Sequence, residues 1–127
     1  MKRVCFGPRT VRYYPWLFRL ACAAEQFGAR LVVVLEHQNC GAVAATLKDL
    51  KRPTENRSPN LGTIVDRIRP AVEPLISTSA NDATLLRQAL QSNVRASVSQ
   101  LKRGSGVLET LVRDDGLLIV GSRVLAE

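Results

Sequence analysis

The sequence predicts an α/β fold in which helices dominate and flank a small sheet of two to three strands. Apolar residues recur at helical spacing in several segments, whereas residues 31–35 and 117–120 are short runs of branched apolar residues typical of strands. With 127 residues, 46% of them hydrophobic and 23% charged, the chain has room for one core. We therefore expect one globular domain over residues 1–127.

The first part of the chain predicts a weak strand, a helix and a confident strand. Residues 3–6 form the weak strand, and the helix covers about residues 14–26 and ends at Gly28, a natural C-terminal stop. The strand at 31–35 follows. The inward side of this helix is predicted to consist of Leu17, Leu20, Ala24 and Phe27.

Two helices separated by a polar loop are expected next. The first covers about residues 41–50, and the loop at 51–59 contains two prolines. The second helix has Asn60 as a plausible cap, and Pro70 is expected to kink or break it. Its apolar positions are Leu61, Ile64, Val65 and Ile68.

The last third predicts a long helix, a short helix and a strand. The long helix covers about residues 82–102, with glycines at its end, and the short one lies within 107–112. Residues 114–116 make the turn into the strand at 117–120. The residues that the long helix is expected to bury are Leu86, Leu90, Val94, Val98 and Leu101.

The chain is basic, with 18 Lys and Arg against 11 Asp and Glu and a formal net charge of +7. These cations are scattered along the predicted helices, and Arg67 and Arg69 are expected to face solvent or a partner. We interpret the charge as a solvated basic surface and expect neither a nucleic-acid nor a membrane partner. Three cysteines at unrelated spacings predict no disulfide framework, which favours a reducing, cytoplasmic location over a secreted one.

The most informative motif is His37-Gln-Asn-Cys40, directly after the apolar run at 31–35. An imidazole and a thiol three residues apart are good ligands for a metal such as zinc. Cys40 is expected near a helix N-terminus, where the helix dipole favours the thiolate. Two ligands do not hold zinc, so spacing alone also permits a satisfied histidine and a buried free cysteine.

Three segments resemble the β-class carbonic anhydrases. They are residues 31–47 (LVVVLEHQNCGAVAATL), 58–75 (SPNLGTIVDRIRPAVEPL) and 116–123 (GLLIVGSR). The resemblance implies a mostly parallel sheet, a Zn²⁺ cofactor and a lyase that reversibly hydrates carbon dioxide to bicarbonate by zinc-bound hydroxide. It also implies a homo-oligomer, as a dimer or larger assembly.

The resemblance makes His37 and Cys40 two of the three protein zinc ligands of the family. The third is a cysteine in a Cys-x-Asp-Ser-Arg motif, whose Asp and Arg form the dyad that orients the zinc-bound solvent. This chain has no such motif, and the nearest segment, residues 5–9, has Gly and Pro in place of Asp and Ser. No catalytic residue is therefore identified. The third ligand could be Cys5 first of all, Cys22, Glu36 (where the family usually has Gly) or a group from a partner subunit.

Two functions follow from the family pattern and its departures. One is a carbonic anhydrase-like zinc enzyme. The other is an inactive, N-terminally incomplete remnant of that fold that acts as a subunit-association module. If the segment carrying the motif is missing, the strand at 31–35 loses a neighbour, and its open edge invites pairing with another chain. Self-association is therefore expected in either case.

Overall fold

The computed structural model describes residues 15–53, 55, 58–78 and 81–123. Within this part, the predicted helices and the two confident strands are all present, and most of their bounds lie within two residues of those expected. The weak strand predicted at residues 3–6 lies outside the described residues. In chain order the elements are α1 (Pro15–Phe27), β1 (Leu31–Glu36), α2 (Gly41–Lys51), α3 (Pro59–Val72), the short 3₁₀ helix η1 (Glu73–Leu75), α4 (Asp82–Arg103), α5 (Gly106–Asp114) and β2 (Leu118–Arg123).

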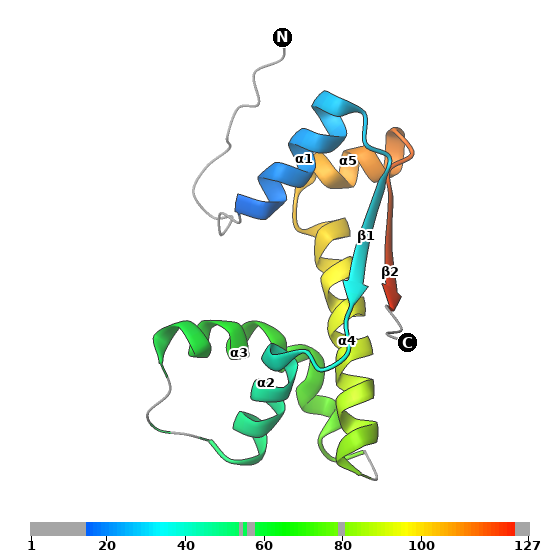
Figure 1. Ribbon diagram of the computed structural model, residues 1–127. Coiled ribbons are helices and arrows are strands. Elements are labelled where there is room, and N and C mark those ends of the chain that lie inside the picture. Colours follow the sequence, from blue (N-terminus) through cyan, green and yellow to red (C-terminus); the bar gives the residue numbers. More distant parts are fainter. Residues whose placement is uncertain (1–14, 54, 56–57, 79–80, 124–127) are drawn as a thin grey trace.

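The two strands form a parallel sheet, which confirms the predicted α/β fold. The pairing begins at Leu31 and Leu118 and ends at Glu36 and Arg123. Both strands therefore finish at the same edge, and all the helices from α2 to α5 lie between them in the sequence. Figure 1 shows the strands side by side, with β1 leading directly into α2.

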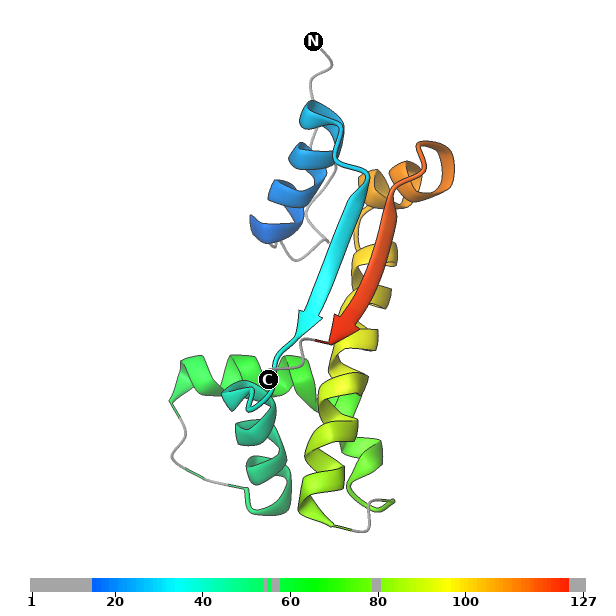
Figure 2. The ribbon, with the colours of Figure 1, turned by 45° about the vertical axis from the view of Figure 1, so that its right-hand side comes forward.

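Helix α4 is the longest helix described and contacts both the sheet and the α2–α3 pair. Its 22 residues span about 33 Å at the rise of an α-helix. Figures 1 and 2 show that its C-terminal half lies behind the strands, whereas its N-terminal half packs with α2 and α3. The backbone N–H of Thr84 donates to the Asn81 side chain, which caps the helix, and Lys102 and Arg103 lie in its last turn. Within the described part of the chain, none of the helices combines the length and hydropathy needed to cross a bilayer.

Two apolar clusters lie along α4. The upper cluster joins α1, α4, α5 and the sheet, and its buried members are Leu17, Ala24, Leu101, Leu108, Leu111, Leu117 and Ile119. The lower cluster joins α2, α3 and α4, and its buried members are Val43, Leu47, Ile68, Val72, Leu85, Ala89 and Leu90. A hydrogen bond from the Ser92 hydroxyl to the Ala71 carbonyl also links α4 to the end of α3. Because α4 contributes to both clusters, it holds the sheet and the α2–α3 pair in one structure.

Among the described residues, helices cover one face of the sheet and leave the other face exposed. Val32 and Val34 pack into the upper cluster, on the side of α4 and α5. The side chains that alternate with them point the other way because successive strand residues face opposite sides. The exposed apolar residues of this outer face are Leu31, Val33, Leu35 and Leu118. We call these four residues the outer sheet face.

Several sequence expectations about single residues were wrong. Phe27 was expected to face inward, but it is 86% exposed because it is the last residue of α1 and lies beyond the packed part of that helix. Val94 and Val98 were expected to be buried in α4 but are only half-buried, because they lie where α4 passes the open end of the sheet.

The predictions for α3 also need correction. The cap is Ser58 rather than Asn60, since the backbone N–H of Leu61 donates to the Ser58 hydroxyl at 3.3 Å. Pro70 does not break the helix, which continues to Val72. Arg69 does not simply face solvent, because its guanidinium lies 3.0 Å from the Asp49 carboxylate of α2. This ion pair fixes α3 against α2, whereas Arg67 is exposed as expected.

Candidate metal site at the end of the first strand

The His37–Cys40 motif lies in the turn between β1 and α2, as predicted. The strand ends at Glu36, and the chain turns at Asn39, whose φ of 57° lies in the left-handed region that asparagine tolerates. Cys40 is the N-cap of α2, with extended backbone angles. The sequence therefore folds here as a strand, a tight turn and a helix, and the turn carries both candidate ligands.

The His37 side chain is exposed and one of its ring nitrogens is engaged locally. Its Nδ1 lies 3.1 Å from the carbonyl oxygen of Gln38. A carbonyl can only accept, so Nδ1 donates, and in the neutral ring Nε2 then keeps its lone pair. This is the tautomer in which an imidazole can bind a metal through Nε2.

The Cys40 side chain is a half-buried free thiol at the start of α2. It makes no side-chain capping hydrogen bond, and it packs against the lower cluster. The α2 N-terminus places the positive end of a helix dipole close to this residue.

The proposed third ligands are not brought to this turn by the described residues. Glu36 is buried on the α4 side of the sheet, where its Oε1 accepts from the Nε of Arg123 at 3.1 Å. Cys22 belongs to α1, which packs with α5 at the opposite end of β1 (Figure 1). Cys5 lies outside the described residues.

A complete zinc site is not formed within the part of the chain that the structure describes. No group of three or more His, Cys, Asp or Glu there could hold a metal ion. His37 and Cys40 are donors that zinc accepts, but two donors do not make the frame of three protein ligands and one open position that a catalytic zinc needs. These residues alone therefore do not fit a catalytic zinc ion.

Sequence reasoning missed one partner of this region, Arg123. It pairs with Glu36, which is 87 residues away, because the two residues occupy matching positions at the ends of β1 and β2. Opposite charges at the ends of two predicted strands would have been a signal, but only once the parallel register was known. The pair explains how a carboxylate is tolerated at the buried end of the strand.

Comparison with known proteins identifies the family. A family model described as carbonic anhydrase matches residues 16–125, nearly the whole chain. None of the curated proteins compared with the chain matches it. The matched region contains both strands, the His37–Cys40 turn and every described helix except the start of α1. On this match the chain belongs to the carbonic anhydrase family, in its β-class.

Proposed function

We propose that this chain is a carbonic anhydrase-like zinc protein that acts on carbon dioxide and bicarbonate. Membership of the family supports this function in general. The observation that carries the proposal for this chain is the placement of His37 and Cys40 in one turn at the carboxyl end of β1. Ligands collect at this position in parallel α/β sheets.

In this proposal the two residues have different roles. His37 offers Nε2 because Nδ1 is held by the Gln38 carbonyl. Cys40 offers its sulfur at the N-terminus of α2. Since the described residues supply only these two donors, the remaining ligand comes from elsewhere, either from Cys5 or from a partner subunit.

Zinc binding by the purified 127-residue chain tests this proposal. Zinc content after dialysis and the affinity for added zinc are measured for the unmodified chain and for His37→Ala and Cys40→Ser. Cys22→Ser is the matched control, because it removes the other described free thiol at the far end of β1. We expect zinc binding to be lost in His37→Ala and Cys40→Ser and retained in Cys22→Ser.

Two further measurements sharpen the result. Loss of zinc in Cys5→Ser would identify the remaining ligand, and stopped-flow hydration of carbon dioxide would show whether the zinc-loaded chain is active. Zinc affinity that is the same in His37→Ala as in Cys22→Ser would contradict the proposed site.

A second function, a subunit-association module, is favoured by the outer sheet face. Four large apolar side chains are 43–58% exposed on this face, and no described strand pairs with the edge of β1 opposite β2. Exposed apolar patches and open strand edges are common association surfaces. We propose that copies of this chain associate through this face and edge.

Sedimentation velocity over a range of concentrations tests the association. Val33→Lys places a charge in the middle of the outer sheet face, so we expect it to shift the chain toward monomer. Thr110→Lys adds the same charge at an exposed position of α5 and is the control. A monomeric unmodified chain, or equal effects of the two substitutions, would contradict this role.

A further inference from the structure

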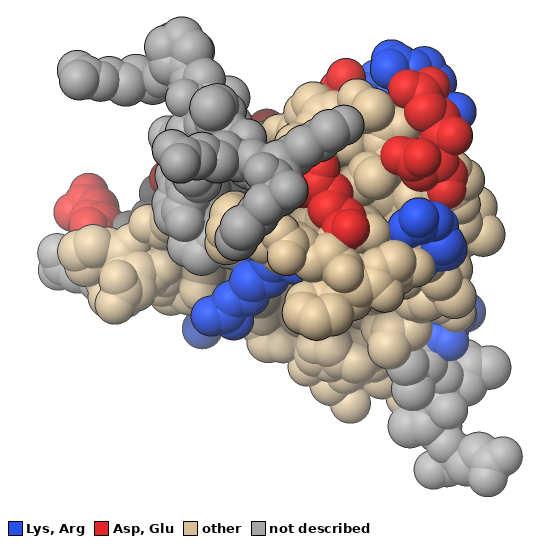
Figure 3. Space-filling model, turned by 90° about the horizontal axis from the view of Figure 1, so that it is seen from above, with Lys and Arg blue, Asp and Glu red and all other residues tan. Residues whose placement is uncertain are grey.

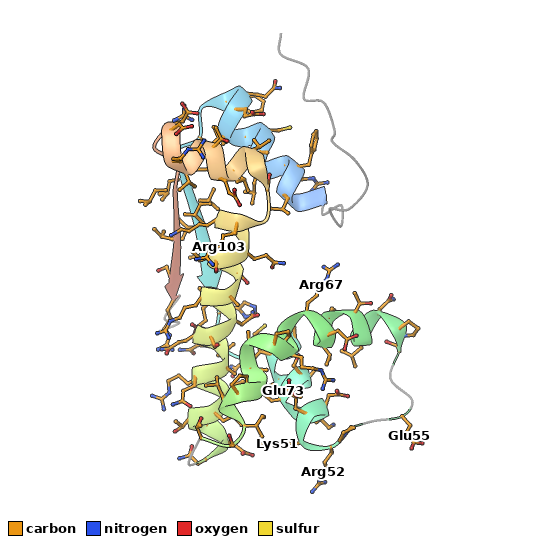
Figure 4. All side chains as sticks on the ribbon, turned by 180° about the vertical axis from the view of Figure 1, so that it is seen from behind. Lys51, Arg52, Glu55, Arg67, Glu73 and Arg103 are labelled. Carbon is orange, nitrogen blue, oxygen red and sulfur yellow. The ribbon has the colours of Figure 1, made fainter. Side chains whose placement is uncertain are left out.

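A groove lies between α4 and the end of β2, on the side of the sheet away from the outer sheet face. Its volume is about 530 Å³, within the usual range of small-molecule sites. Four cationic side chains and one carboxylate line it. They are Arg95, Lys102 and Arg103 of α4, Arg123 of β2, and Glu36 of β1. Figure 4 shows Arg103 near the C-terminal end of α4, beside the strands.

The spacing of residues along α4 explains why these cations share the groove. Arg95, Ser99 and Lys102 are separated by four and three residues, which places them on one side of a helix, and Arg103 adjoins Lys102. The C-terminal end of α4 contributes the negative end of the helix dipole to the groove. The full charges of the cationic side chains outweigh this partial charge. One wall of the groove is therefore built by a single long helix.

Gly121 brings the other wall close. A Cβ at this position would lie 2.6 Å from the Cγ1 atom of Val94, so only glycine lets β2 approach α4 this closely. The end of β2 consequently places Arg123 opposite the cations of α4. Val94 and Val98 supply an apolar surface between the two walls.

The charges in the groove are not balanced by the described residues. The carboxylate of Glu36 is engaged by Arg123 at 3.1 Å. Within the described residues, no carboxylate lies at ion-pair distance from Arg95, Lys102 or Arg103. Acidic and basic side chains are interspersed at the α1–α5 end of the molecule (Figure 3), so the groove differs from that end. Clustered cations with low-dielectric walls attract multivalent anions.

We propose that this groove binds the phosphoryl group of a small phosphorylated molecule. Guanidinium groups match phosphate oxygens with paired hydrogen bonds, and Ser99 of α4 offers a hydroxyl donor. The valine surface and the volume suit an organic part joined to the phosphate. The site does not depend on zinc, because none of its lining residues is a candidate ligand except Glu36, which is already paired with Arg123.

Calorimetric titration of the 127-residue chain in zinc-free buffer tests the proposal. The probes are phenyl phosphate and inorganic phosphate. The test variant is Arg95→Gln/Arg103→Gln, and the matched control is Arg19→Gln/Arg87→Gln, which removes the same charge from exposed positions outside the groove. All four positions are exposed on helices, and thermal melts check that each variant is folded.

We expect phenyl phosphate to bind more tightly than inorganic phosphate. Each lost charge-assisted hydrogen bond weakens binding by about tenfold or more, so the groove variant should bind at least tenfold more weakly. The control should change affinity by less than about twofold, since distant exposed charges are screened. If Arg95→Gln/Arg103→Gln does not fold, Lys102→Gln is titrated in its place, with Arg87→Gln as its control.

Three results would overturn the proposal. Equal weakening in the groove variant and the control would show general attraction to a basic protein. Equal affinity for phenyl phosphate and inorganic phosphate would show that no organic part is recognised. A single-stranded oligonucleotide that competes with phenyl phosphate and binds the chain more tightly than phenyl phosphate does would assign the groove to nucleic acid.

Discussion

Gly121→Ala should destabilise the protein through one contact between β2 and α4. The added methyl group would lie 2.6 Å from Cγ1 of Val94 and 3.4 Å from Cγ2 of Val98. Carbon atoms at van der Waals contact are about 3.5–4.0 Å apart. The strand and the helix must therefore separate by several tenths of an ångström, or Val94 must leave its rotamer.

Neither adjustment is cheap. Valine in a helix has one strongly preferred χ1, so Val94 cannot simply turn away. Overpacking of this kind typically costs about 1–3 kcal/mol. Replacing glycine by alanine also stabilises by about 0.4–1 kcal/mol through the unfolded chain, which offsets part of the cost. We expect a net loss of about 1–2 kcal/mol in the free energy of unfolding.

Urea unfolding followed by circular dichroism measures this loss, and a double-mutant cycle tests its cause. Val94→Ala removes the methyl group that would collide, so Gly121→Ala should cost less in that background, with an interaction of at least about 0.5 kcal/mol. Gly106→Ala is the control, because nothing lies within 4 Å of its added Cβ and its φ does not require glycine.

Two outcomes would refute the reasoning. One is a Gly121→Ala protein as stable as Gly106→Ala. The other is a cycle in which the effects of Val94→Ala and Gly121→Ala simply add, because additivity would show that the two positions do not compete for space.

Two further predictions concern helix ends and ion pairs. Ser58→Ala should lower the free energy of unfolding by about 0.5–2 kcal/mol because the hydroxyl accepts from the Leu61 N–H, whereas Ser105→Ala should lower it less because that side chain makes no capping bond. Thermal unfolding compares the two variants, and equal losses of stability would contradict the assigned cap. Asp49→Asn should lower the free energy of unfolding by about 1–2 kcal/mol, since its mostly buried carboxylate pairs with a partly exposed Arg69. Asp82→Asn, at an 89% exposed side chain, should lower it less, and the reverse order in urea unfolding would contradict this reasoning.

Local features of the fold were predictable because the signals that set them are local. The recurrence of Leu and Val at helical spacing predicted α4 and α5, and the apolar runs at 31–35 and 117–120 predicted both strands. The strand–turn–helix around His37 and Cys40 followed for the same reason. These elements depend on residues within a few positions of one another.

Features that depend on distant pairs could not be predicted in this way. Arg69 meets Asp49 across two helices, and Arg123 meets Glu36 across the sheet. The periodicity of α1 assigned Phe27 to its inner side but could not show that the last residue of α1 extends beyond the surface on which the helix packs. The basic groove combines cations of α4 with a strand at the end of the chain, so scattered arginines in the sequence gave no sign of it.

The parallel pairing of β1 with β2 has a consequence for how the chain folds. Glu36 and Arg123 are 87 residues apart, so the sheet closes a long loop whose entropy must be lost before any strand contact repays it. Helices α2 to α5 can form earlier, from contacts between near neighbours, and they shorten the path that the two strands must cover. We therefore expect strand pairing to be a late event in folding, and substitutions confined to the sheet to speed unfolding more than they slow refolding.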